Sequence, residues 1–313
     1  MRILVSGASG LIGQELVRTL LDDGQQVLQL VRRPANTSAK TTEFQWDPDH
    51  GAFDSSRLGH IDAAINLGGV PIADKRWSAE RKLQISESRV RSTRLIAQAL
   101  ASLPEPPAVF ICASAVGYYG NRGEEPLTEE SGPGEGFLAD TALRWEEATD
   151  AARAVGIRTI NARFGLVLSH RGGYIGKIQL IFQSALGGKV GNGRQWWSWI
   201  TLQDAINALS FCIANENLEG PVNFTSPSPV RNEEMTRAIG KTLHRPTWFT
   251  VPRPMLKLMF GQMGEETMLH SQLAYPTKLQ DAGFEWNYPE LMPALQYELI
   301  SARSDRWGSS TWR

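Results

Sequence analysis

The sequence predicts an α/β protein, with a doubly wound parallel sheet followed by a smaller C-terminal substrate lobe. Over the first two-thirds of the 313 residues, short and almost continuously apolar runs alternate with longer stretches of helical periodicity. Beyond Arg163 the alternation stops, and segments rich in glycine, tryptophan and proline follow. We therefore expect one domain over residues 1–164, a partly interleaved lobe over 165–300 and a flexible tail over 301–313.

The elements follow one another in the order that such a sheet requires. Strands are predicted at residues 2–6, 26–31, 43–46, 61–66, 108–114 and 157–163. Helices are predicted at residues 11–22, roughly 78–101 and roughly 137–154. A shorter helical pattern over 232–243 has an apolar stripe that core packing explains.

Composition excludes several classes of partner. The 32 basic and 33 acidic residues give no field that would favour nucleic acid or an anionic membrane. No run approaches the roughly 18 apolar residues of a membrane span, and a strand from residue 2 leaves no room for a signal peptide. Cys112 and Cys212 are interpreted as buried reduced thiols of a cytoplasmic protein, and the five scattered histidines indicate no metal site.

The stretch "RILVSGASGLIG" joins a strand to a helix through closely spaced glycines. Gly7 permits a tight turn, Gly10 lets the backbone approach a pyrophosphate, and Gly13 allows close packing of helix and sheet. The glycines alone are a weak signal, but this context favours a dinucleotide site over a purely structural turn. The residues expected to form it are Gly7, Ser9, Gly10, Leu11, Ile12 and Gly13.

The end of the second strand favours one cofactor over another. An NAD site usually has an acidic residue there, which accepts hydrogen bonds from the ribose hydroxyls. This strand ends in "LVRRP", and Arg32 and Arg33 can instead pair with a 2′-phosphate and stack on adenine. The alternative is two solvated surface arginines. We interpret the pair as a signal for NADP(H).

Together, "GASGLIG", "NLGG" (66–69) and "SAVGYYG" (114–120) resemble the extended short-chain dehydrogenase/reductases, the fold family of nucleotide-sugar epimerases. Further stretches, among them "INLGGVPIADKRWS" and "GNGRQWWSWITLQD", narrow the resemblance to the atypical branch labelled epimerase family protein or, in places, cell-division inhibitor homologue. The resemblance implies a Rossmann-like sheet and an NAD(P)-dependent oxidoreductase or isomerase. It places Asn66, Leu67, Gly68 and Gly69 beside the adenosine and the nicotinamide ribose, and Arg163 and Gly165 near the nicotinamide.

The sequence departs from the family in its catalytic residues. The wider family has a tyrosine and, four residues on, a lysine on the helix after the fifth strand, and here Phe137 and Thr141 stand in their places. The resemblance still assigns Ser114 to polarising the substrate. Tyr118 and Tyr119 lie just beyond it, and one of them is either the proton donor or a packing or substrate-contact residue.

Three further features are candidates for ligand contact. In "GNGRQWWSWITLQD", Arg194 could clamp an anion while Trp196 or Trp199 forms a substrate wall, the alternative being a buried structural cluster. Lys75 either is a solvated charge or reaches over the active-site mouth. Arg89, in "SESRV", is interpreted as a cofactor- or interface-facing residue that passes behind the nicotinamide pocket.

These observations leave three functional hypotheses open. The first is an NADP(H)-dependent oxidoreductase or epimerase that acts on a small anionic or nucleotide-linked substrate. The second is a non-catalytic NADP(H)-binding regulatory or sensor protein, which the missing dyad favours. The third is a structural partner with a vestigial site. A homodimer through the helices at 78–101 and 137–154 is an analogy with relatives of this fold.

Overall fold

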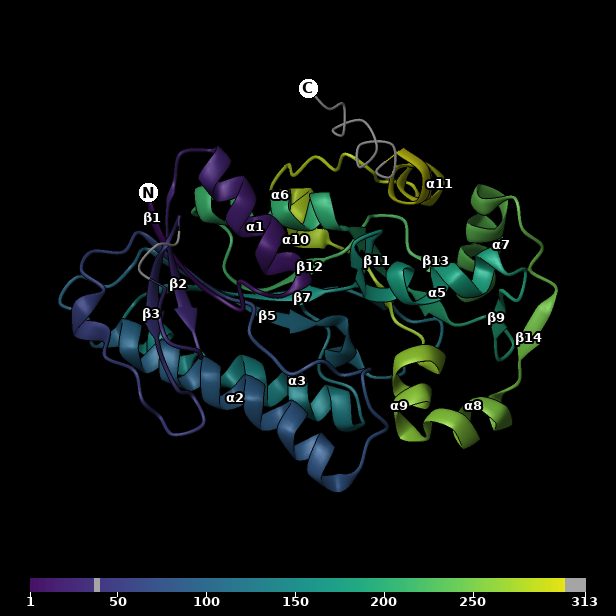
Figure 1. Ribbon diagram of the computed structural model, residues 1–313, viewed down its shortest axis with the longest axis horizontal. Coiled ribbons are helices and arrows are strands. Elements are labelled where there is room, and N and C mark those ends of the chain that lie inside the picture. Colours follow the sequence, from purple (N-terminus) through teal and green to yellow (C-terminus); the bar gives the residue numbers. More distant parts are fainter. Residues whose placement is uncertain (37–39, 302–313) are drawn as a thin grey trace. The chain divides into compact units, whose positions relative to one another are not determined.

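A seven-stranded sheet with the order β12-β7-β5-β4-β1-β2-β3 organises much of the chain in the computed structural model, which describes residues 1–36 and 40–301 (Figure 1). Its strands are β1 (Arg2–Ser6), β2 (Gln26–Val31), β3 (Thr42–Gln45), β4 (Ala63–Asn66), β5 (Val109–Ala115), β7 (Arg158–Phe164) and β12 (Gly220–Phe224). β1 pairs in parallel with β2 on one side and with β4 on the other. The chain order reverses between these two neighbours, which makes this a topological switch point where such sheets bind ligands. The predicted doubly wound sheet is confirmed.

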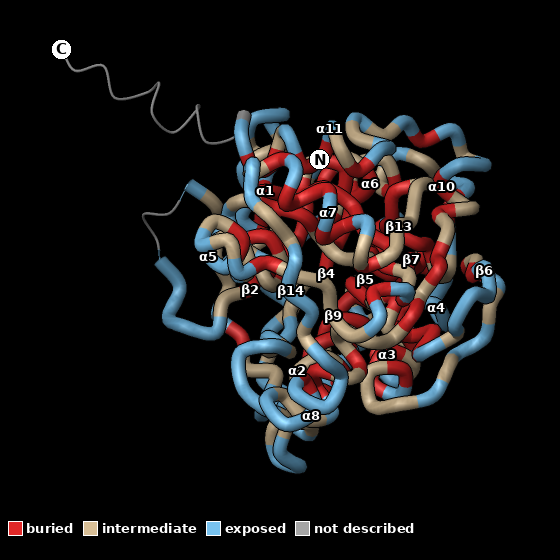
Figure 2. Tube along the Cα trace, turned by 90° about the vertical axis from the view of Figure 1, so that its right-hand side faces the viewer, coloured by how far each residue is buried: buried red, intermediate tan, exposed pale blue. Residues whose placement is uncertain are grey.

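Helices cover both faces of this sheet, with α1 (Leu11–Asp22) and α6 (Leu202–Ala214) on one face and α2 (Ala79–Ala101) and α3 (Phe137–Glu147) on the other (Figure 1). The Ser78 side chain caps α2 by accepting a hydrogen bond from the Arg81 amide. The predicted helix over 137–154 is two helices, because α3 ends at Glu147 and α4 (Asp150–Ala154) follows. Figure 2 shows the central strands as buried segments, consistent with their apolar composition.

The edge strand β12 was not among the predicted strands. It begins with Gly220 and Pro221, residues that weaken a strand prediction. Proline is tolerated at the edge of a sheet because an edge strand leaves one row of amide groups unpaired. β12 lies at such an edge, next to β7.

The chain divides into two compact units. Unit 1 contains residues 1–118, 137–163 and 206–222, and therefore nearly all of the seven-stranded sheet. Unit 2 contains residues 119–136, 164–205 and the chain from 223 on. The sequence predicts a first domain over residues 1–164 and a partly interleaved lobe over 165–300. In these two units the chain passes from one to the other repeatedly. The predicted flexible tail lies, from residue 302 on, outside the described residues.

Unit 2 is built from short elements around an apolar core. Its helices are α5 (Gly173–Gln183), α7 (Asn232–Leu243), α8 (Arg253–Phe260), α9 (Gln262–Gly264), α10 (Thr277–Asp281) and α11 (Leu291–Gln296). Its paired strands are β6 (Pro126–Leu127) with β15 (Leu273–Ala274), β8 (Leu166–Ser169) with β11 (Trp199–Thr201), β9 (Gly188–Val190) with β14 (Phe249–Val251), and β10 (Trp196–Trp197) with β13 (Val230–Arg231). The short helical turns are η1 (Ser55–Arg57) in unit 1, η2 (Val116–Tyr119) where the chain passes from unit 1 to unit 2, and η3 (Glu265–Leu269) and η4 (Tyr297–Ser301) in unit 2. Trp199, Met235, Ile239 and Leu295 belong to the core cluster.

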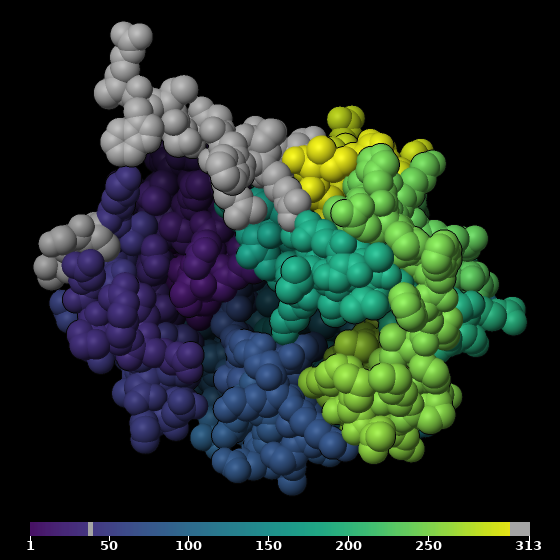
Figure 3. All heavy atoms as spheres, turned by 45° about the vertical axis from the view of Figure 1, so that its right-hand side comes forward, coloured from purple at the N-terminus to yellow at the C-terminus, as the bar shows by residue number. Residues whose placement is uncertain are grey.

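One stretch of unit 2 exposes large apolar side chains. Trp248 is 88% exposed and Leu258, on α8, is 77% exposed. Figure 2 shows α8 largely in the exposed colour, and Figure 3 shows the yellow-green stretch that contains it at the surface. Within the described residues, no helix has both the length and the apolar character needed to cross a lipid bilayer.

Candidate cofactor and substrate sites

The glycine turn after β1 is tightly packed against its surroundings. Gly7 has φ +75°, and a Cβ on it would lie 2.6 Å from the carbonyl carbon of Leu67. A Cβ on Gly13 would lie 2.2 Å from the Gly7 carbonyl oxygen. Gly10 has no such contact below 3.4 Å, and its amide donates to the Gly7 carbonyl at 3.0 Å. Packing therefore requires glycine at positions 7 and 13, whereas Gly10 leaves room for a ligand to approach the backbone closely.

The N-terminus of α1 has the properties of an anion site. Its N-cap is Gly10, no side chain caps it, and no acidic residue lies in its first turn. The amide groups at such a helix start have no partner within the helix, and the helix dipole adds positive potential there. Ser9 and Gly10 are exposed and Leu11 and Ile12 are partly exposed, so the turn is open to a ligand.

The loop after β4 forms the opposite wall of this cradle. The buried Asn66 side chain donates to Thr93 Oγ1 at 2.8 Å and accepts from the Gly68 amide at 3.1 Å, which fixes the turn of Leu67 and Gly68. Ser6 Oγ is buried without a hydrogen-bond partner among the described residues, 3.2 Å from where a Gly68 Cβ would lie. Buried polar atoms normally have partners. A cradle that leaves this hydroxyl and the helix amides unsatisfied fits a dinucleotide diphosphate.

The two arginines after β2 differ in their surroundings. Arg33 donates from both terminal nitrogens to the Glu43 carboxylate, at 2.7 Å each. These hydrogen bonds lower the pKa of Glu43. Arg32 is exposed and forms no ion pair within the described part of the chain. Arg32 is thus the more available of the two for a 2′-phosphate.

Ser114, at the end of β5, belongs to a buried charged network in unit 1. Its hydroxyl donates to Glu146 Oε1 at 2.7 Å. Arg163, at the end of β7, donates to both oxygens of the same carboxylate at 2.8 Å. All three side chains are almost completely buried. Arg163 therefore balances a buried charge. Its position near the nicotinamide stays a prediction.

The two tyrosines have different environments. The Tyr118 ring lies beneath Arg163, whose guanidinium carbon is 3.6 Å from the ring centroid. Tyr119 is fully buried in unit 2, and its hydroxyl lies 2.9 Å from the Thr128 carbonyl oxygen and 2.8 Å from Asn223 Oδ1. These contacts correspond to the packing alternative for Tyr119. Gly165, also in unit 2, donates its amide to the Phe224 carbonyl at 3.1 Å.

Helix α3 contains neither a tyrosine nor a lysine. Phe137 opens it and packs edge-on against Trp77, with 4.8 Å between the ring centroids, while Lys82 Nζ lies 5.7 Å from the Phe137 ring. Thr141 is buried. The departure from the family's dyad therefore holds for the whole helix and not only for two aligned positions.

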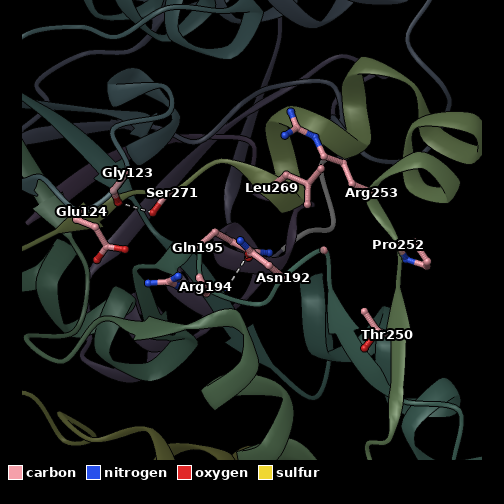
Figure 4. Close-up of a pocket in the computed structure, with 11 residues that line it drawn as sticks. Gly123, Glu124, Asn192, Arg194, Gln195, Thr250, Pro252, Arg253, Leu269 and Ser271 are labelled. Carbon is pink, nitrogen blue, oxygen red and sulfur yellow. Dashed lines mark hydrogen bonds between the residues drawn. The ribbon is translucent and has the colours of Figure 1, made fainter.

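Unit 2 contains a pocket with a volume of about 680 Å³ (Figure 4). Glu124, Arg194 and Arg253 are among the residues that line it. Arg253 pairs with Glu265 at 2.5 Å, and Glu124 accepts hydrogen bonds from Arg231, which lower its pKa. The Arg194 side chain forms no ion pair or hydrogen bond with any described residue. Of the two arginines that line the pocket, it is the one without an ion pair to a described carboxylate, although its charge also acts on Glu124.

The two predicted substrate tryptophans lie in different surroundings. Trp199 is fully buried in the core of unit 2, and its Nε1 donates a hydrogen bond to the Ser228 carbonyl. The ring of Trp196 lies 4.5 Å from the Arg231 guanidinium, and its Nε1 donates to Glu124 at 2.7 Å. The burial of Trp199 corresponds to the structural-cluster alternative, whereas Trp196 is partly exposed. A substrate role for Trp196 stays a prediction. Lys75, in unit 1, is exposed.

Sequence reasoning missed the carboxylates that hold these cations. Glu146 pairs with Arg163, Glu43 with Arg33, and Glu124 with Arg231. Each pair joins positions at least ten residues apart, and single-sequence patterns carry no signal for such contacts. As for metals, residues 1–36 and 40–301 hold no cluster of three or more histidine, cysteine or acidic side chains suited to an ion.

Comparisons with known proteins agree with this geometry. A model of the NAD dependent epimerase/dehydratase family matches residues 3–224, and a domain of unknown function, DUF1731, matches residues 251–298. The epimerase family protein Mb2239 of Mycobacterium bovis is 41% identical over 296 residues, which cover 94% of this chain and 96% of that protein.

Two solved structures are similar over nearly the whole chain. The human epimerase family protein SDR39U1, solved with NADPH, has a TM-score of 0.86 at 29% sequence identity. The match covers 95% of this chain and 99% of the human chain. The nucleoside-diphosphate sugar epimerase from Corynebacterium glutamicum has a TM-score of 0.79 at 31% sequence identity. The match covers 100% of this chain and 62% of the Corynebacterium chain.

Proposed function

Because the chain belongs to the NAD dependent epimerase/dehydratase family, we propose that it binds NADP(H) and acts as an oxidoreductase or epimerase on a small anionic or nucleotide-linked substrate. The observation that carries the proposal is the cradle between Gly7 and Gly69. It combines an uncapped helix start with a buried, unpartnered Ser6 hydroxyl. Exposed Arg32 and the NADPH in the human relative's structure favour NADP(H) over NAD(H).

When bound, the nicotinamide ring supplies the chemistry of hydride transfer. The backbone amides of Leu11 and Ile12 would hold the diphosphate, and Arg32 would pair with the 2′-phosphate. The Ser114 hydroxyl already donates to Glu146, so its oxygen lone pairs are left to accept a hydrogen bond. Tyr118 is the acid–base candidate that we assign to the end of β5, in place of the tyrosine missing from α3.

The anionic substrate is inferred from the pocket in unit 2. Glu124 is paired with Arg231 and Arg253 with Glu265, whereas Arg194 forms no ion pair with a described residue, although its charge also acts on Glu124. A guanidinium with five free donors binds a carboxylate or phosphate in bidentate fashion. The net positive charge of this lining therefore favours an anion.

A regulatory NADP(H)-binding protein is the second candidate. The absence of tyrosine and lysine from α3 favours it, because the usual proton transfer cannot run from that helix. Such a protein would bind the cofactor and change shape without turnover.

One experiment separates these functions. Nucleotide-free protein is titrated with NADPH and NADH in parallel, with tryptophan fluorescence as the signal, and absorbance near 340 nm is then followed after metabolite pools are added. Tight NADPH binding with steady loss of absorbance supports the enzyme. Tight binding without loss supports the sensor, and binding of neither nucleotide overturns both.

A further inference from the structure

Arg89 on α2 is a partly buried cation without an acidic partner. Its Nη1 donates to the carbonyls of Val70 at 2.9 Å and Ile85 at 3.0 Å. No described carboxylate forms an ion pair with it, although Arg91 and Arg144 nearby both pair with Glu87. Hydrogen bonds to carbonyl oxygens satisfy donors but leave the charge uncompensated.

The position of Arg89 connects the cofactor loop with α3. Its guanidinium carbon lies 3.0 Å from where a Cβ on Gly69 would be, and 5.1 Å from the Trp145 ring of α3. Trp145 Nε1 and the Asn66 amide both donate to Thr93 Oγ1, so the loop and the helix share one anchor on α2. Removal from water, together with nearby Arg81, lowers the pKa of Arg89 to about 10. The side chain is therefore still charged at pH 7.

In a doubly wound sheet, the two halves on either side of the switch point each bind one nucleotide of the cofactor. β2 and β3 continue from β1 on one side, and β4 and β5 lie on the other. The 2′-phosphate candidate Arg32 follows β2, which assigns the adenosine to that half. Arg89 lies on the helix that joins β4 to β5, and therefore belongs to the half that receives the nicotinamide nucleotide.

We infer that Arg89 supplies the positive charge of the lysine that α3 lacks, and that it holds the nicotinamide half of the dinucleotide from α2. This inference rests on the proposed NADP(H) binding. It explains why a cation that costs free energy to bury is kept beside Gly69 without a carboxylate. It also explains how a site without the family's lysine can still retain its cofactor. Arg144 does not supply this charge, because it is already paired with Glu87.

The test compares Arg89→Gln with Arg89→Lys. Glutamine keeps a donor for the carbonyls but removes the charge, whereas lysine keeps the charge and loses the two-carbonyl bridge. Arg94→Gln, an exposed position on the same helix, is the matched control. The dissociation constants of NADPH and of 2′,5′-ADP, which lacks the nicotinamide half, are measured for each variant. Thermal midpoints without nucleotide are recorded alongside.

We expect Arg89→Gln to weaken NADPH binding by about tenfold or more, the loss typical of a charged hydrogen bond. Affinity for 2′,5′-ADP should not change, and Arg89→Lys should bind NADPH nearly as wild type does. Unchanged NADPH affinity in a folded Arg89→Gln overturns the inference, as does an equal loss for both ligands. If the glutamine variant does not fold, a folded lysine variant that loses NADPH affinity overturns it. Failure of the wild-type protein to bind NADPH would instead reject the proposed function.

Discussion

The glycine turn and helix α3 flank the same sheet, but only the turn carries the residues that the family resemblance predicts. The turn is made of backbone, and its shape follows from Gly7 and Gly13, where any side chain would collide with neighbouring backbone. Helix α3 packs against α2 and β5, and it contains neither a tyrosine nor a lysine. Its Glu146 is the centre of a buried ion pair with Arg163.

The difference teaches that cofactor binding and proton transfer depend on separate features of this fold. A backbone cradle survives most side-chain changes, whereas acid–base chemistry depends on one or two side chains. The following variants test whether the two regions are independent, beginning with the largest expected effect.

Glu146→Gln should cause the largest loss of stability. It leaves the Arg163 guanidinium buried without a counter-charge, and breaking a buried pair costs about 3–5 kcal/mol. Urea denaturation of this variant and of Glu147→Gln, an exposed neighbour on α3, provides the measurement. Equal midpoints for wild type and Glu146→Gln would show that the pair does not hold α3 against β7.

Gly13→Ala should affect both stability and binding. Its Cβ would lie 2.2 Å from the Gly7 oxygen, so the turn has to move, at a typical overpacking cost of about 1–3 kcal/mol. NADPH affinity should fall with it, because the diphosphate contacts come from the same turn. Gly176→Ala, on α5 with open space around it, should stabilise by up to about 1 kcal/mol and leave binding unchanged. Normal NADPH affinity in Gly13→Ala would show that the glycine turn does not bind the cofactor.

Arg32 and Arg33 should contribute unequally to the preference for NADPH over NADH. Arg32→Ala is expected to weaken NADPH binding about tenfold without affecting NADH, the effect of one lost phosphate contact. Arg33→Ala should have a smaller effect, since Glu43 already occupies both terminal nitrogens. Glu43→Gln releases Arg33 and should increase the preference for NADPH. A larger effect at Arg33 than at Arg32 would reverse this assignment.

The smallest effect concerns Glu129, a buried carboxylate of unit 2 that accepts from the backbone amides of Asn223 and Lys278. Burial raises its pKa above the ordinary 4.5. The folded state therefore binds a proton that the unfolded state releases, and this contribution to stability is lost as pH rises through the folded pKa. Glu129→Gln should flatten that part of the profile of unfolding free energy against pH. An unchanged difference between wild type and variant from pH 4 to 7 would contradict it.

Local patterns were sufficient for six of the seven strands of the sheet and for the glycine turn. Ile3, Leu4 and Val5 form an apolar run, and the glycine spacing after them is itself a backbone requirement. The predicted helices over 11–22 and 232–243 are confirmed as α1 and α7. These features depend on neighbours in the sequence, which is why one sequence reveals them.

The remaining features depend on distant partners. Nothing near Arg163 in the sequence indicates Glu146, and nothing near Trp196 indicates that Arg231 covers its ring. β12 was missed because its proline is compatible only with an edge position, which the sheet order decides. The roles of Ser114, Tyr118 and Arg194 stay predictions until a substrate is found.

The interleaving of the two units constrains how the chain folds during synthesis. Unit 1 needs residues 206–222, so two segments of unit 2 have left the ribosome before its sheet can be completed. Until β12 arrives, β7 is an open edge that can pair with another chain. A version shortened at residue 164 would keep that edge permanently, and should therefore aggregate during expression where the full chain does not.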